Sequence, residues 1–109
     1  MYVNVQKGEV SVTNPENGAL PEIFSIIPGP GGLQVARQRF SSLSPNAPLM
    51  TEAEIGELYS TALHVQFRFA PLYDRDPFEM PLDLEFKLKG RERALQIKQV
   101  RPYYARSAP

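Results

Sequence analysis

The chain has 109 residues, 42% of them apolar, which is enough for one domain with a modest core. Lys plus Arg and Asp plus Glu are equal at 12 each, which argues against a general nucleic-acid-binding protein. The lack of cysteine excludes disulfides and thiolate chemistry, and His64, the only histidine, excludes a multi-histidine metal site within the chain. No apolar run has the length of a membrane span and no signal-peptide core is present, so we expect a cytoplasmic protein.

The first part of the chain predicts short strands. Valines alternate with polar residues over 3–5 and again over 10–12, which indicates two short strands or one bulged strand. The segment 14–18, Asn-Pro-Glu-Asn-Gly, is a strong turn signal. The segment 20–27 is rich in isoleucine and phenylalanine, so we expect a buried strand there.

The next segments predict a loop and an extended stretch. The glycines and prolines of 28–32 indicate a plain loop, because neither the Lys-Ser/Thr nor the helix of a phosphate cradle follows them. The stretch 33–40 is expected to be extended, with Arg37 and Arg39 on one side of it. Two arginines there fit either an anion site or an ordinary solvated sheet edge.

One long helix is predicted at about 51–68. Thr51 and Glu54 form a capping box, and apolar residues then recur at helical spacing. Pro71 ends the helix. His64 lies beside the apolar face near the helix end, and we interpret it as a structural rather than a catalytic histidine because nothing nearby in sequence orients it.

The segment of about 82–101 predicts a β-hairpin. Apolar and charged residues alternate strictly over 82–89, which is typical of a half-buried strand. Gly90 interrupts the pattern, and a second apolar-rich run follows over 94–100. We assume, for the register, that Lys89 pairs with Leu95 across the connection.

That pairing predicts a polar cluster on one face of the hairpin. It sets Glu85 opposite Gln99 and Asp83 opposite Arg101, and a slip of two residues keeps all four on the same face. Carboxylate and amide oxygens suit magnesium, and a guanidinium matches phosphate oxygens. The alternative is an ordinary solvated face with a cross-strand ion pair, which is the norm for antiparallel sheets.

The basic residues are unevenly distributed. Seven of the twelve lie between Lys87 and Arg106, where Glu92 is the only acid. A local anion site is therefore compatible with the neutral overall charge.

The order of elements predicts an α+β fold. Three or four strands precede the long helix and the hairpin, which suggests a mainly antiparallel sheet with the helix packed on one face. We find no internal repeat or domain boundary, so we expect a single domain over 1–102 and a tail over 103–109.

The two ends of the hairpin resemble a known family. The segment 83–86, Asp-Leu-Glu-Phe, is followed fourteen residues after Glu85 by 99–102, Gln-Val-Arg-Pro. This spacing resembles the close of the nucleotide-binding domain of phosphoenolpyruvate synthases and pyruvate, phosphate dikinases. Gly8-Glu9, Asn14-Pro15-Glu16 and the capped helix fit the same order, so the resemblance spans most of the chain.

The resemblance implies an ATP-grasp type domain of an ATP-dependent phosphotransferase, or kinase. By motif, Glu85 and Gln99 would be ligands of magnesium or of nucleotide phosphates, and Asp83 would be an acidic partner at the metal. Arg101 would hold triphosphate oxygens. In that family ATP and Mg²⁺ sit between two subdomains, and the phosphate passes to a histidine on a swivelling domain and then to pyruvate.

The departures from the family limit what this chain can do alone. The N-terminal ATP-grasp subdomain and the Thr-x-Gly-x-x-x-His phosphocarrier motif have no counterpart, and His64 does not match that motif. We therefore expect the C-terminal part of a nucleotide-binding domain, inactive by itself, that works with the missing subdomain and a phosphohistidine swivelling domain. The alternative is a non-catalytic α+β interaction module. We expect neither nucleic acid nor membrane as a partner.

Overall fold

The structure is a computed structural model and describes residues 1–8 and 19–103. It divides into two compact units, Met1–Gly56 and Glu57–Pro109, and the boundary falls within the single long helix. The predicted strand at 10–12, the predicted turn at 14–18 and all but the first residue of the predicted tail lie outside the described residues.

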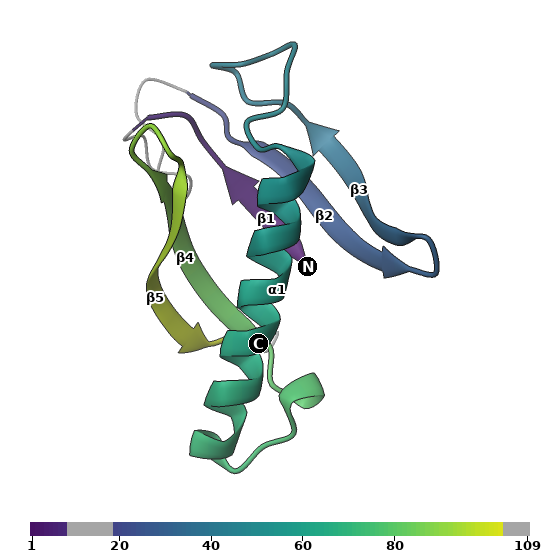
Figure 1. Ribbon diagram of the computed structural model, residues 1–109, viewed down its shortest axis with the longest axis vertical. Coiled ribbons are helices and arrows are strands. Elements are labelled where there is room, and N and C mark those ends of the chain that lie inside the picture. The colour runs from purple at the N-terminus through teal and green to yellow at the C-terminus, as the bar shows by residue number, and fades with distance from the viewer. Residues whose placement is uncertain (9–18, 104–109) are drawn as a thin grey trace, which may run out of the picture. The chain divides into compact units, whose positions relative to one another are not determined.

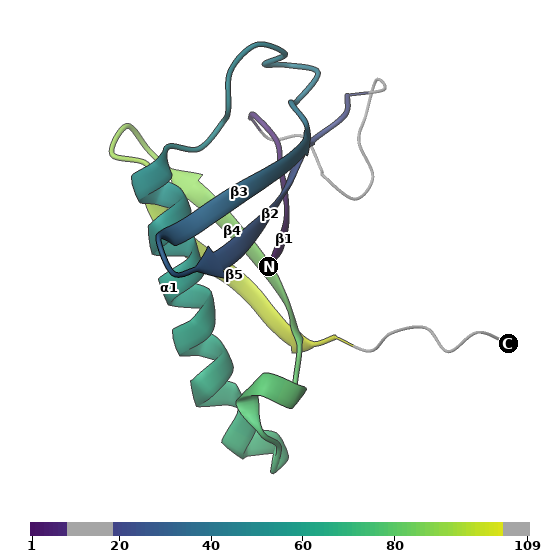
Figure 2. The same ribbon diagram turned by 90° about the vertical axis from the view of Figure 1, so that its right-hand side faces the viewer.

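The first unit contains a three-stranded antiparallel sheet in the order β1-β2-β3 (Figure 1). Its strands are β1 (Tyr2–Val5), β2 (Glu22–Gly29) and β3 (Gly32–Arg39). The predicted loop at 28–32 is instead a tight turn, because β2 continues through Gly29 and pairs it with Gly32. Figure 2 shows β2 and β3 as two long neighbouring arrows joined by this turn.

The central strand β2 supplies most of the buried residues of this sheet. Phe24 and Ile26 are fully buried, and they alternate with less buried neighbours as expected for a strand with one buried face. Glu22 continues the same alternation and is also fully buried. The sheet therefore carries a carboxylate in an apolar row.

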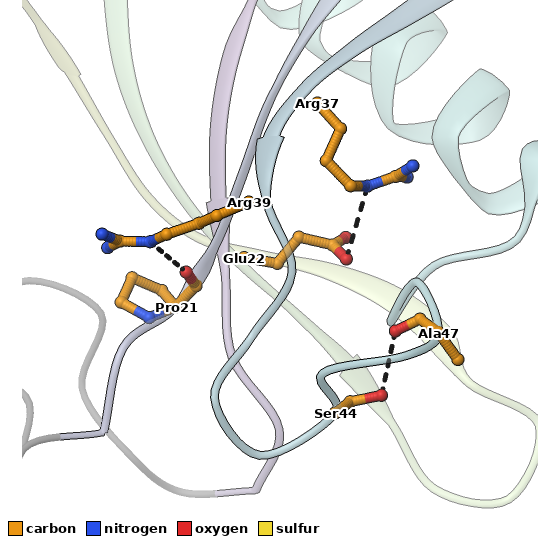
Figure 3. A network of polar contacts seen from close by, with 6 residues as sticks. All are labelled: Pro21, Glu22, Arg37, Arg39, Ser44 and Ala47. Atoms are coloured by element: carbon orange, nitrogen blue, oxygen red, sulfur yellow. Dashed lines mark hydrogen bonds and ion pairs between the residues drawn. The ribbon is translucent and has the colours of Figure 1, made fainter.

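A β-bulge in β3 separates the two arginines of that strand. Phe24 pairs with Arg37 and its neighbour Ile23 pairs with Arg39, which leaves Gln38 as an extra residue. Paired residues share a face and adjacent residues of a strand face opposite sides, so the two arginines point to opposite faces (Figure 3). The prediction that both lie on one side of the strand is wrong.

The helix α1 (Glu52–Phe69) confirms the predicted boundaries to within a residue. The capping box is formed: the Thr51 backbone N–H donates to Glu54 Oε1 at 2.8 Å, and the Glu54 N–H donates to Thr51 Oγ1 at 3.1 Å. Two 3₁₀ helices follow, η2 (Ala70–Tyr73) and η3 (Pro77–Glu79). Along the described ranges, no helix is both long and apolar enough to span a membrane.

The second unit ends in the predicted hairpin. Its strands β4 (Leu82–Lys89) and β5 (Ala94–Pro102) form a separate two-stranded antiparallel sheet. The connection has positive φ angles at Gly90 (75°) and Arg93 (53°). The α+β class, the long helix and the C-terminal hairpin are thus confirmed, and the strands are divided between two antiparallel sheets.

Candidate functional site

The open end of the β4–β5 hairpin brings the four predicted site residues together. Asp83 pairs with Arg101, and Glu85 pairs with Gln99. Paired residues point to the same side of an antiparallel sheet, and residues two apart on one strand share a face. We call Asp83, Glu85, Gln99 and Arg101 the proximal polar face, and its predicted pairing is confirmed.

At the turn end of the hairpin the register differs from the one assumed. Lys89 pairs with Ala94 rather than Leu95. A β-bulge at Lys98 then adds one residue to β5, so the register at the open end is the predicted one. The sequence does contain a signal for the bulge, because the apolar positions of β5 change phase between Ile97 and Val100.

Asp83 and Arg101 form an ion pair across the strands. The Arg101 Nε and Nη2 atoms both lie 2.9 Å from Asp83 Oδ2, so both donors contact the same oxygen. The Arg101 side chain is 67% exposed and that of Asp83 is 46% exposed. An ion pair this exposed contributes about 0.2–1 kcal/mol to stability, so it orients the two groups more than it holds the fold.

The bulge adds a cation that the sequence reasoning missed. Lys98 is the extra residue of β5, and its Nζ lies 3.8 Å from Glu85 Oε1, with both side chains about half exposed. Each carboxylate of the proximal polar face therefore has one basic partner. Gln99 is exposed beside them and supplies an amide oxygen or amide N–H groups.

The strand ends border an open hollow on the surface. Asp83, Arg101, Pro102 and Tyr103 line it. Tyr103 is held there by its backbone N–H, which donates to the Pro81 carbonyl at 2.9 Å and extends the hairpin pairing by one residue. The hollow thus offers one carboxylate, one guanidinium and one aromatic ring.

The donor set fits a partial magnesium site rather than a complete one. No group of three or more His, Cys, Asp or Glu side chains that could hold a metal ion occurs within residues 1–8 and 19–103. Magnesium commonly takes only one or two carboxylates from a protein and completes its shell with water and phosphate oxygens. Asp83 and Glu85 match that need only if phosphate oxygens supply further ligands.

A second polar feature, Glu22 with Arg37, was not foreseen from the sequence (Figure 3). The Arg37 Nε lies 3.6 Å from Glu22 Oε2, which is the distance of an ion pair rather than of a hydrogen bond. Burial raises the pKa of Glu22, while Arg37 and the backbone N–H of Leu49 lower it. The Arg37 guanidinium lies 4.9 Å from the ring centre of Phe40 and 5.9 Å from that of Phe24. Because Glu22 is fully buried, we interpret this pair as structural.

Two further residues, Arg39 and His64, lie apart from the hairpin site in the chain. Arg39 donates from Nε to the Pro21 carbonyl at 3.0 Å, on the face opposite to Arg37. His64 is exposed on α1. Neither residue gains a partner of the kind that a catalytic or anion site requires in the part of the chain that the structure describes.

Comparison of the chain with protein-family models, with curated proteins and with solved structures finds no match. The family resemblance of the two hairpin motifs therefore stays a prediction.

Proposed function

We propose that the proximal polar face is one half of a magnesium–nucleotide phosphate site in an ATP-dependent phosphotransferase. The observation that carries the proposal is the cross-strand register, which pairs Asp83 with Arg101 and Glu85 with Gln99. Phosphoryl transfer depends on positioning and on charge neutralisation more than on covalent help from the protein. Acidic, amide and guanidinium groups side by side on a two-stranded sheet supply both.

The metal ligands would be Glu85, Gln99 and Asp83. Their oxygens are the hard donors that magnesium prefers, and bound Mg²⁺ would neutralise charge on the nucleotide phosphates. Glu85 is paired with Lys98 only at 3.8 Å, so little interaction energy opposes its use as a ligand.

The nucleotide contacts would be Arg101, Glu85 and Gln99. The planar fork of Arg101 matches phosphate oxygens, and its present partner Asp83 is an exposed carboxylate that a more highly charged anion can replace. Tyr103 lines the same hollow, where an aromatic ring offers a surface for a nucleobase.

The proposal covers one side of the site only. The opposite side would come from an N-terminal ATP-grasp subdomain, and a phosphohistidine swivelling domain would receive the phosphate, with pyruvate as final acceptor. Such a protein would work in the cytoplasm. The chain alone is then expected to bind nucleotide weakly and to show no turnover.

The test is an NMR titration of the chain with MgATP, compared with Glu85→Gln and Arg101→Lys. We expect amide shifts at Glu85, Gln99 and Arg101, a weakening of binding by at least about fivefold in each variant, and no change in Glu57→Gln, an exposed control on α1. Shifts that are absent at saturating MgATP, or equal in all variants, would sink the proposal.

The alternative function, a non-catalytic interaction module, is favoured by one observation. Large apolar side chains are exposed around η2 and η3, with Leu72 at 76% and Phe78 at 78%. The Phe78 ring contacts that of Phe67 edge to face, with centroids 5.3 Å apart. Exposed apolar clusters mark interaction surfaces. Sedimentation of wild type and Phe78→Ser tests this: concentration-dependent association that the substitution removes supports it, and monomers throughout argue against it.

A further inference from the structure

The distal half of the hairpin differs in charge from the proximal polar face. Lys87 and Lys89 follow Asp83 and Glu85 on the same side of β4, and Arg91 follows in the connection. We call Lys87, Lys89 and Arg91 the distal basic patch. We propose that this patch is a separate anion site for a linear chain of linked phosphate groups, and that it binds without magnesium.

The cross-strand pairing leaves the lysines without carboxylate partners. Lys87 pairs with Gln96, and Lys89 pairs with Ala94. Both lysines and Arg91 are exposed, and none of the three makes an ion pair with any residue that the structure describes. On the proximal polar face, by contrast, each carboxylate has a basic partner. The same hairpin therefore has a compensated half and an uncompensated half.

The uncompensated half carries an electrostatic cost in the free protein. The strand rise separates the Cα atoms of Lys87 and Lys89 by about 6.8 Å on one face, where like charges repel. Glu92 is the only acid between Lys87 and Tyr103. A bound polyanion would neutralise the lysines and remove this repulsion, so the repulsion destabilises only the free protein.

The composition of this face favours phosphate groups over other anions. Two ammonium groups at strand spacing can each meet a different phosphate of one chain, and Arg91, in the adjoining connection, has a donor fork that phosphate oxygens fit. The residues opposite the lysines are small or neutral, Ala94 and Gln96, so a thin, extended ligand meets no charged side chain there. No aromatic side chain shares this face over 87–96, which argues against a single-stranded nucleic acid held by base stacking.

The proposal is tested with inorganic tripolyphosphate as probe, at low salt and with EDTA to remove divalent cations. We expect tripolyphosphate to shift the amide signals of Lys87, Lys89 and Arg91. AMP, which has one phosphate, should bind at least tenfold more weakly. At 0.5 M NaCl, tripolyphosphate itself should bind at least tenfold more weakly, because screening reduces the attraction between exposed charges. ATP without magnesium serves as a second arm. Binding like that of tripolyphosphate means that the phosphate chain alone is recognised, and shifts with ATP but none with tripolyphosphate would overturn the proposed ligand class.

The matched variants are Lys87→Gln with Lys89→Gln, and Lys7→Gln as the exposed control on the first unit. The double substitution is expected to weaken tripolyphosphate binding at least tenfold, and the control to leave it unchanged. A dispersed amide spectrum shows that each variant is folded. Shifts confined to Glu85 and Gln99, or equal affinity in all variants, would overturn the proposal. Because EDTA removes the metal on which the proposed nucleotide site depends, failure here leaves that proposal separately testable.

Discussion

Replacing Arg37 with leucine should strongly destabilise the first sheet. Glu22 is fully buried, and its nearest cation is the Arg37 Nε at 3.6 Å. With an effective dielectric constant near 20, Coulomb's law gives about 4–5 kcal/mol for two unit charges at this separation. The Arg37 side chain is 26% exposed, so solvent screens part of this, and breaking a buried ion pair typically destabilises by about 3–5 kcal/mol. We therefore expect a loss of about 3 kcal/mol in Arg37→Leu at pH 7.

The double substitution Glu22→Leu with Arg37→Leu provides the comparison. It removes the buried charge together with its partner, so we expect it to lie within about 1 kcal/mol of wild type, because apolar replacement of a buried pair is often neutral or stabilising. Arg39→Leu is the matched control. It loses the hydrogen bond to the Pro21 carbonyl and should lower stability by only about 1–2 kcal/mol.

The assay is native-state hydrogen exchange of the β2 amides, which reports the free energy of opening this sheet. A loss below about 1 kcal/mol in Arg37→Leu would show that the buried carboxylate is stable without its cation, contrary to this expectation. The single variant Glu22→Leu completes the cycle. If the loss in the double variant equals the sum of the losses in Glu22→Leu and Arg37→Leu, the two residues are not coupled and the expectation is wrong.

Four further predictions concern the same chain. Burial raises the pKa of Glu22 above 4.5, so the stability contributed by its neutral form is complete below about pH 4.5 and is lost as the pH rises through the folded-state pKa. Opening of β2 should therefore require less free energy at pH 7 than at pH 5. Hydrogen exchange measures this difference, and Glu22→Gln should remove it. Thr51→Ala should destabilise α1 by about 1 kcal/mol, measured by exchange of its first-turn amides, because the cap is lost. Gly56→Ala should stabilise α1 by about 0.5–1 kcal/mol in urea unfolding, because nothing lies within 4 Å of the added Cβ. Asp83→Asn should change the unfolding free energy by less than about 1 kcal/mol, because the Arg101 pair is exposed; a larger loss would give that pair a structural role.

Local sequence signals were sufficient for the helix. The capping box involves residues three apart, and both of its hydrogen bonds are formed. Pro71 and the apolar spacing then limit the helix to within a residue of its observed end. Such features are predictable because neither the cap nor the spacing depends on residues far away in the chain.

The hairpin shows what alternation can and cannot provide. The open-end pairs of Glu85 and Asp83 were predicted, although the assumed partner of Lys89 was wrong. The connection between the strands is one residue shorter than assumed. The bulge at Lys98 adds one residue to β5, so the pairs beyond it are the predicted ones. The phase change of the apolar positions in β5 was the available signal, and its use would have placed Lys98 beside Glu85.

The buried pair of the first sheet was beyond local patterns. Alternation places Glu22 on the same face as Phe24 and Ile26. A charged residue at the start of a strand is equally compatible with an exposed position, so the sequence does not predict that Glu22 is buried. Arg37 lies on the same face because it pairs with Phe24, and the bulge after that arginine sends Arg39 to the other face. The contact between Glu22 and Arg37 is therefore set by the pairing of β2 with β3, which the residue pattern of a single strand does not contain.

The most direct test of the proposed magnesium–nucleotide half-site is paramagnetic relaxation with Mn²⁺ in place of Mg²⁺. With ATP present, we expect Mn²⁺ to broaden the amide signals of Glu85 and Gln99 far more than those of Lys89, and to do so much less when ATP is omitted, because phosphate oxygens must complete the metal shell. Broadening that is the same with and without ATP, or that is strongest outside the proximal polar face, would contradict the account.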